Sequence, residues 1–212
     1  MPMYYLDIET TGLDPRKDRI ITIQYQAVAP GGRPGGPLHV LKAWEADEKS
    51  ILARFQRDTK FFDRNDPWGF FPTGFNLGFE YRFLLGRMQR HGLDPGVDWD
   101  FAFSKPSLDL HPVAVLMNGG RYKGASLEAF SAKPTSGHAV IHALQTEDWA
   151  TVEDYIQKET DAFFDLLQKL HSAMPRFWEG TLKPLLEGTP PREGMRPPAV
   201  RPPVPRIDGP RP

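Results

Sequence analysis

The alternation of apolar and polar residues in the first part of the chain predicts β-strands joined by turns. Residues 4–9 end in an alternation of apolar and acidic side chains, and residues 19–28 contain three Ile, one Tyr and one Val, all of which favour strands. Residues 30–37 are mostly Pro and Gly, which indicates a turn or flexible loop, and residues 38–44 favour a third strand. Because the connections are short, we expect these three strands to form an antiparallel meander.

Helical spacing of apolar residues begins after this region. Two helices are predicted, one over residues 47–62 with Asp47 as N-cap and one over residues 77–91 with Asn76 as N-cap and Gly92 at its end. The short apolar and aromatic segment between them, residues 69–75, favours a strand. A helix directly after a strand is typical of α/β and α+β domains.

The remainder of the chain is predicted to be mainly helical. We expect a strand over residues 99–103, short helices over residues 110–117 and 125–132, and a long helix over residues 147–174. The 212 residues are enough for one domain with a good core, which we place at residues 1–175. Residues 176–188 would connect it to an extended tail over residues 189–212, where proline and arginine replace large apolar side chains.

Composition restricts the chemistry that the chain can perform. Cysteine is absent, which removes disulfides, thiolate nucleophiles and sulfur-based zinc sites. The formal net charge of −1 is not that of a protein that holds nucleic acid by overall charge, although local arginine clusters occur. The sequence shows neither an apolar run of membrane-spanning length nor a secretion signal, so we expect a soluble cytoplasmic protein.

Asp7 and Glu9 are the first candidate site residues. They stand two positions apart on the first predicted strand, so both side chains point to the face opposite Leu6 and Ile8. Two like charges held so close repel each other unless a cation lies between them, and carboxylate oxygens suit a hard divalent ion. The alternative is a half-buried strand with an acidic outer face.

Two further acids lie at unusual positions on the predicted helices. Glu80 is at the edge of an apolar stripe and in a first helical turn, where the helix dipole alone would also favour a carboxylate. Glu159 falls in the middle of an apolar helix face, one turn from Tyr155, where an acid is costly unless it is paired or bound to metal. Asp161 lies on the opposite, solvent-facing side of the same helix.

Three segments in this order resemble one known family. The runs YLDIETTGLDP, GFNLGFEYRFLL and YIQKE resemble the motifs of the DnaQ-like 3′-5′ exonucleases, or DEDD superfamily, over residues 3–172. The third run is similar to that of the tyrosine branch. The Asp109 region, followed by a compact helical stretch and then Tyr155, is similar to the YprB-like and family B polymerase-like proofreading exonucleases. The resemblance implies a ribonuclease-H-like α/β fold, with a mixed sheet flanked by helices.

The resemblance also implies roles for particular residues. Two ions, Mg²⁺ or Mn²⁺, would lie about 4 Å apart and would be held by four acids, Asp7, Glu9, Glu80 and Glu159. Tyr155 would orient the attacking water, since a phenol is a poor base at neutral pH. The 3′ end of a single strand of DNA or RNA would meet Thr10, Thr11, Leu13, Phe75 and Asn76.

The chain departs from the family pattern in two places and leaves alternatives open. Glu80 and Glu159 stand where the family has aspartate, which predicts weaker activity, a preference for manganese, or loss of activity. In the histidine branch, His142 with Glu147 would be the third motif, but Tyr155 and Glu159 share a helix face and are favoured.

Two other functions compete with that of a free exonuclease. One is a non-cutting module that binds nucleic acid or a polymerase or repair partner. The other is a proofreading subunit held to a polymerase through the Pro/Arg-rich tail.

Overall fold

A computed structural model describes residues 2–131, 140, 142–144 and 146–188. The chain divides into two compact units, Met1–His171 and Ser172–Pro212, and each is described by itself. The predicted tail, residues 189–212, lies outside the described residues. The division at residues 175 and 188 stays a prediction.

The first unit contains a mixed β-sheet that confirms the α/β class. Its strands are β1 (Met3–Thr10), β2 (Ile20–Ala29), β3 (Arg33–Pro34), β4 (His39–Lys42), β5 (Phe71–Gly74) and β6 (Leu108–Asp109). Their order is β3-β2-β1-β5-β6, with β4 also paired to β2. The pairs β1–β2 and β2–β4 are antiparallel, as the short connections predicted, whereas β5 and β6 join in parallel.

Helices flank this sheet. They are α1 (Glu48–Thr59), α2 (Leu77–Arg90), α3 (Trp99–Ser104), α4 (Leu110–Met117), α5 (Leu127–Phe130) and α7 (Trp149–Phe177), of which α7 continues into the second unit. That unit contains a π-helical turn, η1 (Trp178–Leu182), and α8 (Lys183–Leu186). Among the described residues, no helix is both long and apolar enough to cross a membrane.

The strand predicted at residues 99–103 is wrong, because this segment is helix α3. The carboxylate of Asp98 accepts a hydrogen bond from the Phe101 amide at 2.9 Å and caps the helix. Trp99 and Phe103 are one helical turn apart, and their rings stack at 5.9 Å. An aromatic run has high strand propensity, but a cap and a ring pair at helical spacing outweigh it here.

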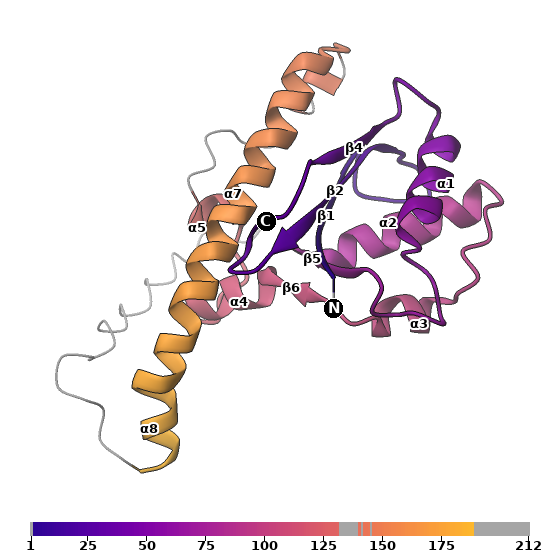
Figure 1. Ribbon diagram of the computed structural model, residues 1–212. Coiled ribbons are helices and arrows are strands. Elements are labelled where there is room, and N and C mark those ends of the chain that lie inside the picture. Colours follow the sequence, from indigo (N-terminus) through magenta and orange to yellow (C-terminus); the bar gives the residue numbers. More distant parts are fainter. Residues whose placement is uncertain (1, 132–139, 141, 145, 189–212) are drawn as a thin grey trace, which may run out of the picture. The chain divides into compact units, whose positions relative to one another are not determined.

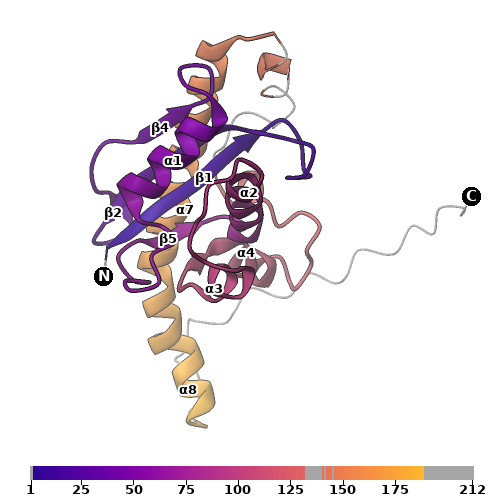
Figure 2. The same ribbon diagram turned by 90° about the vertical axis from the view of Figure 1, so that its right-hand side faces the viewer.

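Two apolar clusters cover the two faces of the sheet. In the first, Leu6 and Ile8 of β1 pack with buried residues of α1 and α2. In the second, Tyr5 packs with buried residues of α7, α4 and α5. Figures 1 and 2 show α1 and α2 on one side of the sheet and α7 on the other. The acidic side chains of β1 therefore point to the α7 side.

Helix ends were partly predictable. Asp47 caps α1 as predicted, accepting from the Ser50 amide at 2.7 Å, and Gly92 follows α2 with φ of 65°. Asn76 stands at the N-cap of α2, but it has a left-handed backbone and its side chain makes no capping bond. The Asp109 carboxylate caps α2 instead, by accepting from the backbone amides of Asn76 and Leu77.

Candidate active site

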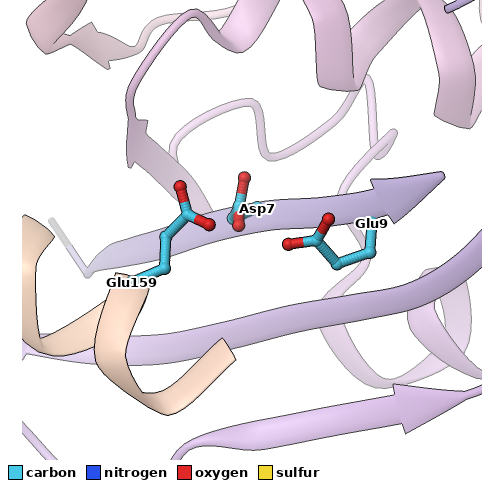
Figure 3. A group of neighbouring side chains, drawn as sticks. All are labelled: Asp7, Glu9 and Glu159. Atoms are coloured by element: carbon cyan, nitrogen blue, oxygen red, sulfur yellow. The ribbon is translucent and has the colours of Figure 1, made fainter. Parts of the chain in front are cut away.

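Three of the four predicted acidic ligands converge. Asp7 and Glu9 lie on β1 and Glu159 lies on α7, and each offers a carboxylate oxygen within 4.8 Å of the others. Figure 3 shows the three carboxylates directed toward one another from these two elements. All three are half-buried. A strand and a helix that are about 150 positions apart in the chain thus build one group of hard oxygen donors.

Asp7 is held in place by the neighbouring strand. Gln24, which lies opposite Asp7 in the β1–β2 register, donates from its amide nitrogen to the Asp7 carboxylate at 2.8 Å. The Thr22 hydroxyl donates to the side-chain amide oxygen of Gln24 at 3.0 Å, which fixes the direction of that amide. The Tyr5 hydroxyl lies 3.3 Å from the same Asp7 oxygen. Asp7 is thereby positioned before any ligand arrives.

The sequence contains a signal that could have revealed Gln24, namely a row of polar residues on the second strand. Thr22, Gln24 and Gln26 alternate with apolar residues along β2, and all three are buried. A buried polar row on a strand next to an acidic strand requires hydrogen-bond partners. That requirement points to a polar network between the two strands.

Glu80 is buried, but it is not one of the three residues whose carboxylate oxygens lie within 4.8 Å of one another. Its side chain is 4% exposed, and one of its carboxylate oxygens has no hydrogen-bond partner among the described residues. Burial, followed by the charge of Asp7, raises the pKa of Glu80 well above its ordinary value. Burial thus favours the protonated carboxyl, whereas a divalent ion at the site would favour the ionised form. The orphaned oxygen and the converging carboxylates fit a hard metal ion.

Asp109 positions the helix that carries Glu80. Its two carboxylate oxygens accept from the backbone amides of Asn76 at 2.8 Å and Leu77 at 3.0 Å. It also accepts from the His111 amide at 2.9 Å and caps α4. One aspartate at the end of β6 thus satisfies the first amides of two helices. Because the contact with α2 spans more than 30 positions, local sequence patterns did not reveal it.

Tyr155 lies one turn before Glu159 on α7 and is buried. Burial, the charge of Glu159 and hydrogen bonding with that carboxylate raise the pKa of Tyr155 far above its ordinary value. This shift favours the protonated phenol, which can donate a hydrogen bond. A phenol held in its protonated form is a poor base.

The predicted substrate contacts fall into two groups of residues, one in the turn after β1 and one at a cavity beside Glu159. Thr10 donates to the Gly12 carbonyl at 2.6 Å and Thr11 accepts from the Arg19 amide at 3.0 Å, so both shape the turn after β1. Leu13, in the same turn, is 84% exposed. Phe75 and Asn76 line a cavity of about 360 Å³ together with Glu159 and two aromatic residues that the sequence analysis missed, His111 and Tyr122.

The competing histidine motif lies outside the acidic group. His142 and Glu147 are both exposed, and neither belongs to the acidic group found among the described residues. Glu147 has a positive φ of 55° just before α7 begins. The choice between the two third motifs stays a prediction, with Glu159 adjacent to Asp7 and Glu9.

Comparison with known proteins gives structural matches only. No protein-family model and no curated protein sequence matches the chain. Among solved structures, the zinc-bound form of Escherichia coli exonuclease I in complex with single-stranded DNA matches with a TM-score of 0.57 and 15% identity. The match covers 84% of this chain and 42% of that one. The chain therefore shares the fold of this exonuclease I structure over most of its length.

Two further structures agree with this one. An exonuclease I structure that addresses processivity gives a TM-score of 0.55 at 14% identity, covering 86% of this chain and 43% of that one. E. coli exonuclease I with a dT13 oligonucleotide gives 0.53 at 13% identity, with 84% and 42% covered. The chain spans about two fifths of the length of these exonuclease I chains. The likeness confirms the ribonuclease-H-like fold, but the YprB-like branch stays a prediction.

Proposed function

We propose that this protein is a metal-dependent 3′-5′ exonuclease that releases nucleotides from the 3′ end of single-stranded DNA or RNA. The observation that carries this proposal is the convergence of Asp7, Glu9 and Glu159 within 4.8 Å, with Glu80 buried where the charges of Asp7 and Glu159 contribute to its raised pKa. The DnaQ-like fold supports it, because the exonuclease I structures that share this fold include complexes with single-stranded DNA.

The four carboxylates suit Mg²⁺ or Mn²⁺ because all their donor atoms are hard oxygens. When bound, two such ions would supply an activated water and neutralise the charge that develops on the phosphate. Glu80 would ionise as the ions bind and would release a proton. Gln24 holds Asp7 in its orientation throughout, so this ligand loses little freedom when metal binds.

The other side chains bind and orient the substrate. Tyr155, as a protonated donor next to Glu159, would hold the attacking water in line with the scissile bond. Thr10, Thr11 and Leu13 would meet the terminal nucleotide from the turn after β1. Phe75 and Asn76, with the rings of His111 and Tyr122, would hold its sugar and base in the cavity beside Glu159.

The proposal is tested with end-labelled single-stranded DNA and RNA, in magnesium and separately in manganese. The wild-type protein should shorten the strands from the 3′ end, and Asp7→Ala should abolish this release. Asp161→Ala removes an exposed acid two residues from Glu159 and should retain full activity. Undiminished nuclease activity of Asp7→Ala would contradict the proposal.

A second candidate is a module with this fold that binds nucleic acid or a protein partner without cutting. It is favoured by the two glutamates at aspartate positions and by the raised pKa of Glu80, which favours the neutral form of one proposed ligand. Such a protein would have no need for a paired metal site. Failure to bind Mn²⁺ at millimolar concentration, together with retained oligonucleotide binding, would favour it over the exonuclease.

A polymerase partner held through the Pro/Arg-rich tail also stays a proposal. The tail lies outside the described residues, so it rests on composition alone. Co-purification of a polymerase with the full chain, and its loss on deletion of residues 189–212, would test it.

A further inference from the structure

A basic and aromatic groove lies over the outer face of α2. It has a volume of about 720 Å³, and its lining includes a leucine from the turn after β1, two aromatic rings from α3 and three arginines. These residues are Leu13, Trp99, Phe103, Arg16, Arg82 and Arg90. We call this set the arginine groove. The acidic site has no part in its lining.

The aromatic residues of the groove are unusually exposed. Trp99 is 40% exposed and Phe103 is 49% exposed, although the two rings stack on each other at 5.9 Å. Large aromatic side chains normally bury most of their surface, and exposed aromatic residues gathered in one concavity mark a binding surface. Flat exposed rings also accept the faces of nucleic-acid bases.

The charge of the groove is positive. Three arginines and one aspartate, Asp14, line it, which leaves two net positive charges. Arg16 pairs with Asp14 at 3.0 Å. Within the described part of the chain, Arg82 and Arg90 form no ion pair, and they donate only to the backbone oxygens of Gly78 and Arg16. Their remaining N–H groups are available to an anionic ligand.

The groove is built on a rigid base. Arg87, buried on α2, donates two hydrogen bonds of 2.6 and 2.7 Å to the Glu48 carboxylate and a third, of 3.2 Å, to the Pro15 carbonyl. Arg90 donates to the Arg16 carbonyl at 3.0 Å. The turn that carries Leu13 is therefore fixed to α2 at two successive residues. A groove held in this way binds with little loss of conformational freedom.

We propose that the arginine groove binds an unpaired polynucleotide strand, with phosphates at Arg82 and Arg90 and bases against Trp99 and Phe103. This inference rests on the proposed nuclease function and extends it to the part of the strand that lies upstream of the 3′ end. Leu13 is four residues after Glu9, so the Cα atom of Leu13 lies at most about 14 Å from the Cα atom of Glu9, a proposed metal ligand. About four stacked nucleotides at 3.4 Å each span that distance.

The test measures binding by fluorescence anisotropy with labelled dT15 and U15, in an Asp7→Asn background that prevents cutting. Arg82→Ala with Arg90→Ala should weaken binding about tenfold and lower the salt slope by about 1.4, at about 0.7 for each single-strand phosphate contact. Trp99→Ala with Phe103→Ala should weaken binding about tenfold without changing that slope. The matched control is Arg54→Ala with Arg57→Ala, which removes two exposed arginines of α1.

The outcomes separate this inference from the proposed function. With Asp7 intact, the arginine pair variant should cleave dT3 at the wild-type rate and show a higher KM for dT15. If wild type cleaves nothing, the exonuclease proposal fails, while the anisotropy measurement still decides the groove. Groove variants that bind dT15 and U15 as tightly as the control would overturn the inference. The inference would also be overturned if the groove variants kept their oligonucleotide affinity but lost the ability to bind an aspartate-rich peptide. That result would indicate that the ligand is a protein.

Discussion

From Leu6 onward, the two faces of β1 contribute different things to the protein. On one face, Leu6 and Ile8 are buried among the apolar side chains of α1 and α2. On the other, Asp7 and Glu9 lie half-buried next to Glu159 of α7. One strand thus anchors the core and holds the proposed ligands, because successive side chains point in opposite directions. Metal ligands on a strand are held rigidly when the opposite face of that strand is fully packed.

The largest change in stability is expected for a substitution on the face of β1 that carries Leu6 and Ile8. Leu6 is fully buried, so Leu6→Ala should lower the free energy of unfolding by about 2–5 kcal/mol through lost burial and the cavity left behind. Asp7→Asn, one residue away, should leave stability unchanged or raise it, because it relieves repulsion among like charges. Urea unfolding with a chelator present measures both. Equal losses in the two variants would contradict the division between the faces.

A second effect concerns Glu80 and pH. Because its pKa is raised in the folded protein, the native state keeps a proton that the unfolded chain loses above about pH 4.3. The free energy of unfolding should therefore fall as pH rises through this window, by at most about 1.4 kcal/mol per pH unit. In Glu80→Gln this fall should be absent. Urea unfolding of the metal-free proteins between pH 5 and 7 tests it, and parallel curves would refute it.

A smaller effect is expected from Tyr155. Tyr155→Phe removes only the hydroxyl, so we expect kcat to drop about tenfold while KM stays the same. Because the pKa of Tyr155 lies far above the working range, the alkaline side of the pH–rate profile should not move. A steady-state pH series on labelled single strands checks both. A shifted alkaline limb would show that the phenol acts as a base.

Local patterns predicted much of the fold. Alternation along β1 and β2 and the apolar spacing of α1, α2 and α7 follow from burial on one face, which the sequence records residue by residue. The segment at Trp99 failed because aromatic residues favour strands in general, whereas the Asp98 cap and the Trp99–Phe103 pair favour a helix here. The two-residue strand β3, within the predicted loop, is too short to leave a pattern.

The candidate site was predictable only where a residue contradicted its surroundings. Glu159 on an apolar helix face and Asp7 with Glu9 on one strand face were such contradictions, and the structure places all three together. Asp109 and Gln24 act through contacts between distant segments, which no local spacing encodes. His111 and Tyr122 join the cavity through the fold alone.

The central claim is that the converging acids bind a divalent cation, and calorimetric titration with MnCl2 tests it most directly. Wild type should bind Mn²⁺, and both Asp7→Asn and Glu159→Gln should weaken binding by about tenfold or more because each removes a ligand charge. Asp161→Asn, on the exposed side of α7, should bind as wild type does. Equal Mn²⁺ affinity in wild type and Glu159→Gln would contradict the account.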